Sequence, residues 1–175
     1  MLIKDNNYKV MKLFFDNPDK KFHIREIARQ TGLSASGVLI ILKRLKAQNF
    51  LESEKENLVE NVKASRNENF FLIKRAHNTT SLFESGLIQY LRDQYEEPEA
   101  IVVFGSYSRG EDISQSDIDI AVVTKKQARL DLKDFEKYLK RNISIYEIQI
   151  AKAEKEFLNN LANGIVIHGF LRLLE

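Results

Sequence analysis

The residues with the clearest chemical potential are two aspartates, Asp117 and Asp119, that follow a glycine–serine turn at Gly105-Ser106. In a β-strand, side chains at positions i and i+2 project from the same face, so the two carboxylates are expected side by side, while Ile118 and Ile120 point into a core. Adjacent carboxylates repel each other, and a shared proton or a cation relieves the repulsion. A divalent cation beside a turn that can fit a phosphate indicates nucleotide chemistry.

The Gly105-Ser106 turn offers a place for phosphates. Glycine lets the backbone approach a phosphate closely, and backbone amides at the start of a helix favour an anion. We therefore expect Gly105-Ser106 to bind phosphate, with the serine hydroxyl as a donor and Ser116 as a further candidate. Arg109 either contacts phosphate as well or holds the turn through a neighbouring carboxylate, Glu111 or Asp112.

These residues also carry a family resemblance. The stretch G-S-Y-S-R-G from Gly105, followed by S-D-I-D from Ser116, resembles the minimal nucleotidyltransferases of the polymerase-β-like superfamily, which includes kanamycin nucleotidyltransferase-like proteins. The resemblance covers roughly residues 76–175. It implies that Asp117 and Asp119 bind Mg²⁺, in a site with room for two metal ions. It also implies transfer of a nucleoside monophosphate, AMP from ATP, to a hydroxyl. The acceptor would be a small molecule or a protein, such as a toxin-like partner in a two-component module.

Similar transferases carry a third carboxylate on a neighbouring strand, and Glu147 is the best match here. If Tyr146, Ile148 and Ile150 face the core, Glu147 faces the other way and can meet the two aspartates. It would then complete a second metal site or take the proton from the attacking hydroxyl. The alternative is an exposed strand glutamate, in which case the chain binds nucleotide yet transfers it poorly.

Composition limits the class of protein. The chain of 175 residues, 43% apolar and 30% charged, fits one ordinary globular domain or two small ones. No apolar run approaches the ~20 residues of a membrane span, and the start, Met1 to Asp5, lacks a signal-peptide layout. We therefore expect a cytoplasmic protein without membrane contact. The absence of cysteine excludes disulfides and thiolate metal sites, and the three histidines show no metal-ligand spacing.

The charges are unevenly distributed. Residues 1–76 hold 15 Lys and Arg against 9 Asp and Glu, whereas residues 77–175 hold 12 against 16. A basic half joined to an acidic half indicates two modules with different partners, and the basic half favours a polyanion. A solvated surface without such a partner explains the charges equally well.

The first half shows helical spacing at 6–15, 23–30 and 35–48, with a Thr31-Gly32-Leu33-Ser34 turn before the third helix. Ser34 is placed to cap that helix. We expect strands at 50–52 and 70–73 to form a wing. The polar segment 57–69 between them is either a long flexible wing or a solvated loop, and the loop is favoured. The string F-H-I-R-E-I-A-R-Q-T-G-L-S-A-S-G-V resembles the helix-turn-helix of winged-helix DNA-binding domains.

Whether this module binds DNA or protein stays open. The candidate DNA contacts are Ser34, Ser36, Lys43, Arg44 and Lys46. However, Leu39 and Ile40 are expected on the outer face of the third helix, where polar side chains would be needed to reach base edges. Exposed apolar patches more often mark protein contacts. The alternatives are therefore DNA binding, docking of a protein partner, and formation of a homodimer.

The second half predicts helices at 81–95, 130–141 and 153–162, and strands at 101–104, 118–123, 143–150 and 165–167. Helices alternating with strands give an α/β layer. We therefore expect a two-domain α+β or α/β protein, with a winged helix-turn-helix at 1–76. A nucleotidyltransferase fold at 77–175 would have a mixed sheet flanked by helices. A different function is also consistent, namely a DNA-binding regulator whose transferase-like domain only senses nucleotide or is inactive.

Overall fold

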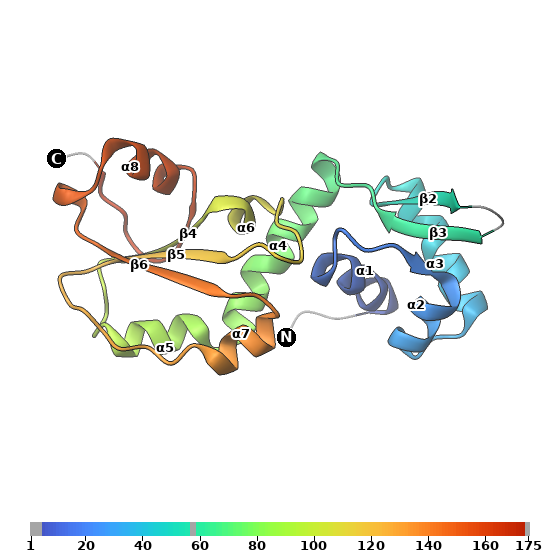
Figure 1. Ribbon diagram of the computed structural model, residues 1–175, viewed down its shortest axis with the longest axis horizontal. Helices are drawn as coiled ribbons and strands as arrows, with labels where there is room; N and C mark the ends of the chain where they lie inside the picture. Colours follow the sequence, from blue (N-terminus) through green and yellow to red (C-terminus); the bar gives the residue numbers. More distant parts are fainter. Residues whose placement is uncertain (1–4, 57–58, 174–175) are drawn as a thin grey trace. The chain divides into compact units, whose positions relative to one another are not determined.

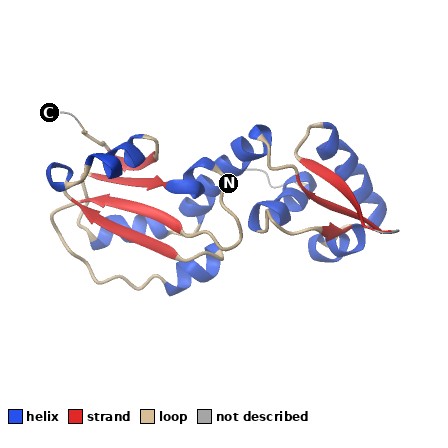
Figure 2. Ribbon diagram, turned by 45° about the horizontal axis from the view of Figure 1, so that its top comes forward, coloured by secondary structure: helices blue, strands red, loops and turns tan. Residues whose placement is uncertain are grey.

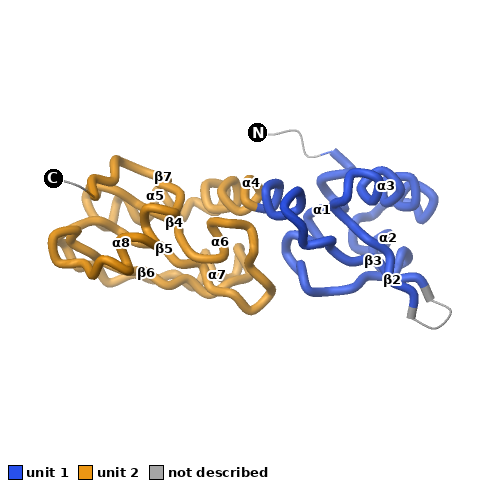
Figure 3. Tube along the Cα trace, turned by 90° about the horizontal axis from the view of Figure 1, so that it is seen from above, with its two compact units in different colours: residues 1–74 blue, residues 75–175 orange. Residues whose placement is uncertain are grey.

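The computed structural model describes residues 5–56 and 59–173. The chain divides into two compact units, residues 1–74 and 75–175, coloured separately in Figure 3. The expected boundary lay two residues later, and no loop marks it because it falls inside helix α4, Glu68–Glu84. The expectation about the first residues, Met1 to Lys4, lies outside the described part of the chain. So do positions 57 and 58 of the expected loop.

The first unit packs helices against a small antiparallel sheet (Figure 1). Its helices are α1 (Asn6–Asp16), α2 (Ile24–Thr31) and α3 (Ala35–Ala47), each within two residues of the expected bounds. The strands β1 (Phe22–His23), β2 (Leu51–Glu56) and β3 (Val59–Ala64) form a sheet in the order β1-β3-β2. Apolar side chains of all these elements meet in one core, which includes Val10, Phe14, Phe22, Ile27, Val38, Leu42, Leu51, Val62 and Phe70.

The turn between α2 and α3 has the expected chemistry. Gly32 ends α2 in the left-handed conformation, at φ 71°, where glycine avoids the Cβ clash that other residues suffer. Ser34 then caps α3, because its side chain accepts a hydrogen bond from the Gly37 amide at 3.1 Å. On the outer face of α3, Leu39 and Ile40 are 51% and 67% exposed, as the helical spacing predicted.

The second strand of the expected wing was misplaced. The strand that pairs with β2 is Val59–Ala64, inside the segment expected to be a loop, and its Val62 is fully buried. The expected strand 70–73 is instead the first part of α4. The Asn67 side chain accepts a hydrogen bond from the Phe70 amide, and Phe70, Lys74 and Asn78 are buried at helical spacing.

The second unit contains a mixed four-stranded sheet in the order β6-β5-β4-β7. Its strands are β4 (Ala100–Phe104), β5 (Ile118–Val123), β6 (Ile143–Ile148) and β7 (Ile165–Gly169). Strand β5 runs antiparallel to β4 and parallel to β6, and β7 runs antiparallel to β4. This mixed sheet with helices confirms the α/β class expected for this half.

Both faces of that sheet are covered (Figure 2). One face packs against α4, α5 (Leu87–Gln94) and α7 (Lys133–Leu139), through residues such as Leu82, Leu91 and Phe135. The other packs against α8 (Lys155–Ala162), which follows a short 3-10 turn, η1 (Ile150–Lys152). Figure 1 shows α8 on one side of the sheet and α5 and α7 on the other.

The helix expected at 81–95 is broken in two. Helix α4 ends at Glu84, and Gly86 takes a left-handed conformation at φ 79° before α5 begins at Leu87. The amide of Leu87 donates to the Ser85 hydroxyl at 3.2 Å. Within residues 5–56 and 59–173, no helix is both long and apolar enough to cross a membrane.

Candidate active site

The two aspartates lie where β5 begins, next to the end of β4. Asp119 pairs with Phe104 across β4 and β5, so its carboxylate is beside the residue that follows Phe104, Gly105. Gly105 has φ 70°, and a Cβ added there would lie 2.6 Å from Asp119 Oδ2. Glycine is therefore required at position 105 for two reasons. It tolerates the left-handed backbone conformation, and it leaves space for the Asp119 carboxylate. The Gly105-Ser106 turn and the carboxylate form one site.

Burial gives Asp119 unusual electrostatics. Asp117 is exposed, whereas Asp119 is partly buried at the end of the sheet. Burial raises the pKa of Asp119, and the charge of Asp117 raises it further, while a hydrogen bond from Tyr146 opposes the shift. The two carboxylates lie close enough for the charge of Asp117 to act on Asp119, as the i, i+2 spacing predicted, and a bound cation would relieve such a repulsion.

A polar side chain and a loop hold Asp117. Asn142, just before β6, donates from Nδ2 to Asp117 Oδ1 at 3.1 Å. Ser116, a predicted phosphate ligand, uses its hydroxyl to accept from the Ile113 amide at 3.0 Å, and its own amide donates to the Ile113 carbonyl. The structure therefore places Ser116 at the closure of the loop that leads into Asp117.

The turn itself opens a short helix, α6 (Gly105–Arg109). Ser108 is buried and donates to the Gly105 carbonyl at 2.9 Å, which fixes the turn from inside. Of the two roles considered for Arg109, the structure shows contact with a carboxylate, because Arg109 Nε donates to Glu111 Oε2 at 2.8 Å. Both partners are about half exposed, so the pair is weak and the guanidinium stays open to an approaching phosphate.

Glu147 does not join the two aspartates, and this prediction was wrong. In the parallel pairing of β5 with β6, Asp119 lies opposite Ser144, whereas Glu147 lies opposite Val122 on the other face of the sheet. Glu147 Oε1 accepts from Tyr95 Oη at 2.8 Å and from the Ala128 amide at 2.9 Å. Burial and this contact raise the pKa of Tyr95. The glutamate therefore anchors the loop after β5.

We expect Glu147→Gln to change nucleotide transfer by less than about tenfold, which corresponds to ~1.4 kcal/mol. Glutamine retains an oxygen that accepts from Tyr95 and from the Ala128 amide, so the fold keeps these contacts. Transfer rates for wild type and variant, compared at saturating nucleotide, check this expectation. A loss as large as that caused by substituting Asp119 would restore Glu147 to the reaction.

The side chains of β6 that do face Asp119 were not predicted. Ser144 stands opposite Asp119 in the register, and the next residue on that face, Tyr146, donates from Oη to Asp119 Oδ1 at 3.4 Å. Strand alternation places Ser144 and Tyr146 on the same face of β6. Because helices cover both faces of the sheet, alternation alone does not tell whether this face is the one that carries the aspartates. The residue opposite Asp119 on β6 is therefore a serine, where the family resemblance implied a carboxylate on a neighbouring strand.

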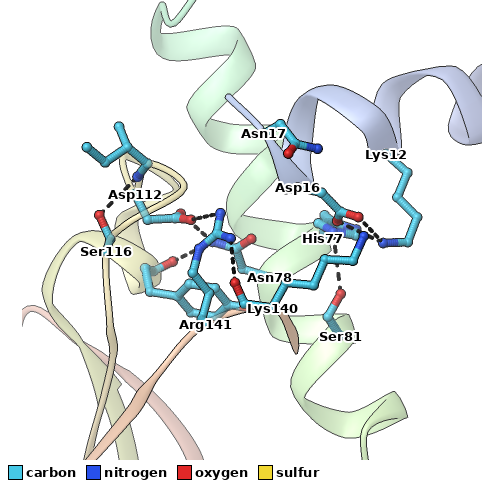
Figure 4. A network of polar contacts seen from close by, with 12 residues as sticks. Lys12, Asp16, Asn17, His77, Asn78, Ser81, Asp112, Ser116, Lys140 and Arg141 are labelled. Atoms are coloured by element: carbon cyan, nitrogen blue, oxygen red, sulfur yellow. Dashed lines mark hydrogen bonds and ion pairs between the residues drawn. The ribbon is translucent and has the colours of Figure 1, made fainter. Parts of the chain in front are cut away.

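A buried polar cluster supports the loops around the site (Figure 4). Asn78 on α4 donates to the Tyr107 carbonyl at 2.9 Å and to Asp112 Oδ1 at 2.8 Å. Arg141 lies 3.6 Å from Asp112 Oδ2, and both side chains are almost fully buried. Arg141 directly precedes Asn142, the partner of Asp117. The cluster therefore ties together α4, the loop after α6, and the start of β6.

The side chains present fit one Mg²⁺ ion better than two. Mg²⁺ is commonly held by one or two carboxylates together with waters and substrate phosphates, and Asp117 and Asp119 supply such a pair. Within the described part of the chain, no group of three or more His, Cys, Asp or Glu side chains converges on a common point. Among residues 5–56 and 59–173, no third carboxylate joins this pair to hold the expected second metal ion.

Some of the residues predicted to contact DNA already make hydrogen bonds or ion pairs within the protein. Ser34 caps the helix, and its hydroxyl lies 3.2 Å from that of Ser36. Lys46 Nζ lies 3.0 Å from Glu60 Oε1 and also donates to the Ser53 hydroxyl. Lys43 and Arg44 also lie on α3, and both are exposed.

Comparison with known protein families finds a similarity within the second unit. Residues 86–169 match the family described as polymerase beta, nucleotidyltransferase. The match contains the Gly105-Ser106 turn, both aspartates, and all four strands of the mixed sheet. Over these residues the second unit is similar to nucleotidyltransferase domains of the polymerase-β type.

Among solved structures, a match is a mutant of the toxin–antitoxin pair MntA–HpeT. It is 23% identical to this chain, covers 50% of this chain and 73% of its own, and has a TM-score of 0.39. So distant a likeness carries no argument about function. No curated protein matches the chain.

Proposed function

We propose that the second unit transfers a nucleoside monophosphate from Mg²⁺-bound nucleoside triphosphate to a hydroxyl group, with release of pyrophosphate. The observation that supports the proposal is the close packing of the Asp119 carboxylate against the Gly105-Ser106 turn, because a carboxylate can bind a cation and such a turn can accept a phosphate. The match of residues 86–169 to the nucleotidyltransferase family supports the same chemistry.

Each part of the site has a task in that reaction. Asp117 and Asp119 would hold Mg²⁺, which would supply positive charge against the charge that develops on the phosphate oxygens. The Gly105-Ser106 turn binds the triphosphate through its backbone and the serine hydroxyl, and Arg109 adds positive charge at the edge. Asn142 keeps the Asp117 carboxylate oriented through its hydrogen bond. These groups mainly position the substrate, which is the greater part of what phosphoryl transfer requires.

The substrate is proposed from the family resemblance of the motif. ATP is the proposed donor, and the acceptor is a hydroxyl on a protein or on a small molecule. Because Ser144 stands where a third carboxylate would face Asp119, the site lacks a strong base for the attacking hydroxyl. We therefore propose slow transfer, with the acceptor's proton passing to an aspartate or to water.

Labelling with ATP that carries ³²P at the α-phosphate tests the function. The chain is incubated with this ATP, Mg²⁺ and cell lysate, and covalent label is followed on proteins and small molecules. We expect label with the wild-type chain and none with Asp117→Ala combined with Asp119→Ala. If none of the four nucleotides gives label, the regulator function is the one that remains.

For the first unit we propose a winged helix-turn-helix that contacts DNA or a protein partner. The three helices and the three-stranded sheet support this, as does the capped turn between α2 and α3. A homodimer formed through this unit is also proposed. The competing function, a DNA-binding regulator that only senses nucleotide, would require salt-sensitive DNA binding together with the absence of transfer.

Glutamates of the hairpin β2–β3 pair with nearby lysines, and this leads to a prediction about DNA affinity. Glu54 Oε1 lies 2.6 Å from Lys21 Nζ, and Lys63 lies 2.6 Å from Glu54 Oε2 and 3.3 Å from Glu52 Oε1. Hydrogen bonds from Lys21 and Lys63 lower the pKa of Glu54 to about 2. Glu60 pairs with Lys46 in the same way. Lys21, Lys46 and Lys63 are therefore already paired with glutamates near neutral pH.

Replacing Glu52, Glu54 and Glu60 together by glutamine should release three lysines for phosphate contacts. If the hairpin touches DNA, its affinity at low salt rises, and the slope of log K against log[salt] steepens by up to about 3. Fluorescence anisotropy with a DNA duplex over a salt series measures both quantities. Unchanged affinity and slope would show that this hairpin does not contact phosphates.

A further inference from the structure

Tyr146 occupies a position in the site that the proposed transfer leaves unexplained. Its phenol oxygen lies 3.4 Å from Asp119 Oδ1, on the same face of the sheet as the aspartates. The ring packs against Phe104, with centroids 5.4 Å apart, and against Phe157 of α8 at 5.8 Å. The residue is nevertheless 40% exposed. A hydroxyl is thus held beside a proposed metal ligand by packing, with one side open to solvent.

The order of the strands determines from which side an acceptor must come. In an in-line displacement, the attacking and leaving oxygens lie on opposite sides of the phosphorus. Asp119 on β5 has the Gly105-Ser106 turn on its β4 side and Ser144 and Tyr146 on its β6 side. If the turn holds the leaving pyrophosphate, the attacking hydroxyl approaches over β6. Tyr146 supplies a hydroxyl on that side.

We propose that Tyr146 is an acceptor of the transfer, so that the chain nucleotidylates itself in cis. The inference rests on the proposed function and names an acceptor for it. In the step, a bond forms between Tyr146 Oη and the α-phosphorus, and the bond from that phosphorus to the pyrophosphate oxygen breaks. Pyrophosphate leaves with the electron pair on the side of the Gly105-Ser106 turn. The phenol proton passes through Asp119 Oδ1 to solvent.

Modification would also change access to the site. A nucleoside monophosphate on Tyr146 would cover the β6 side of Asp119, from which any other acceptor has to enter. The modified chain is therefore expected to transfer more slowly to external hydroxyls than the unmodified chain. Self-modification would therefore inhibit further transfer by the same chain.

Intact mass spectrometry of the full-length chain, after incubation with ATP and Mg²⁺, tests the proposal. We expect a gain of one nucleoside monophosphate per chain, mapped to Tyr146 in the peptide digest. Tyr146→Phe removes the hydroxyl and keeps the ring packing, so it should lose the added mass almost completely. Tyr138→Phe is the matched control, because Tyr138 is 56% exposed on α7 and should leave the modification unchanged.

A mixing experiment separates reaction in cis from reaction between molecules. Tyr146→Phe chains, which keep both aspartates, are mixed with Asp119→Asn chains, which keep the tyrosine. Reaction in cis leaves both species unmodified, whereas modification of the Asp119→Asn chain would overturn the cis step. Added mass on another residue, or persisting in Tyr146→Phe, would overturn the choice of acceptor.

Failure of this inference can be told apart from failure of the proposed function. If the wild-type chain labels a component of the lysate but never gains mass itself, the transfer stands and Tyr146 is not an acceptor. If it labels neither the lysate nor itself with any of the four nucleotides, the proposed function falls, and the self-modification falls with it.

Discussion

Asp119→Asn is expected to lower nucleotide transfer by at least ~10³-fold, equivalent to ~4 kcal/mol of transition-state stabilisation. The substitution removes the charge of the carboxylate that packs against the Gly105-Ser106 turn, while the amide keeps its size. The rate of label transfer from α-³²P ATP, at saturating Mg²⁺ and nucleotide, is the measurement. No other single substitution discussed here should cost as much activity.

The loss should come without loss of the fold. Burial and Asp117 both raise the pKa of Asp119, so its charged form is disfavoured in the nucleotide-free protein. A neutral asparagine relieves that cost, and the free energy of unfolding should stay equal or rise. Asp134→Asn, an exposed carboxylate in the first turn of α7, is the matched control and should keep wild-type transfer. A variant that unfolds at a much lower temperature would mean that Asp119 is structural.

Gly105→Ala is the second large effect that we expect, and it should reduce both stability and activity. A left-handed backbone costs a non-glycine residue roughly 1–2 kcal/mol. In addition, the new methyl group would lie 2.6 Å from Asp119 Oδ2, so the turn and the carboxylate must move apart. Displacing the carboxylate from the turn should lower transfer by ~10²-fold, because a misplacement of about 1 Å has that effect in other enzymes.

Gly86→Ala separates the two contributions. Gly86 has φ 79°, so alanine suffers the same kind of backbone strain, but nothing lies within 4 Å of the added Cβ. This variant should lose stability to a similar degree and keep its transfer activity. Thermal unfolding and transfer rates of both variants provide the comparison. Equal activity of the two would show that the contact between Gly105 and Asp119 does not matter for transfer.

The placement of the two aspartates beside the Gly105-Ser106 turn could be predicted from the sequence because its constraints are local. The bounds of β5 equal the expected ones, because apolar residues stand on both sides of Asp119 along the strand. The bounds of β4 lie within one residue of the expected ones. Gly105 has φ 70° and lies next to the Asp119 carboxylate, whereas the approach of a phosphate to this turn stays a prediction. The face shared by Asp117 and Asp119 needs only the two-residue period of a strand.

The errors came from information that is not local. Alternation along β6 correctly assigns its side chains to the two faces of the sheet. Because helices cover both faces, apolar side chains occur on both, and their presence does not tell which face carries the aspartates. Only the register, Asp119 opposite Ser144, shows that Glu147 is on the far face. Likewise, the short apolar run 70–73 fits a strand or a helix, and burial of Lys74 and Asn78 decides for the helix.

Helix α4 has a practical consequence for dividing the protein into parts. Asn78, whose amide bridges Tyr107 and Asp112, lies in the middle of this 17-residue helix, which starts at Glu68. A fragment cut at residue 77 would place Asn78 at a fraying chain end, where its two hydrogen bonds would be lost. Biochemistry on the isolated transferase half should therefore begin upstream of Glu68, with the capping residue Asn67 included.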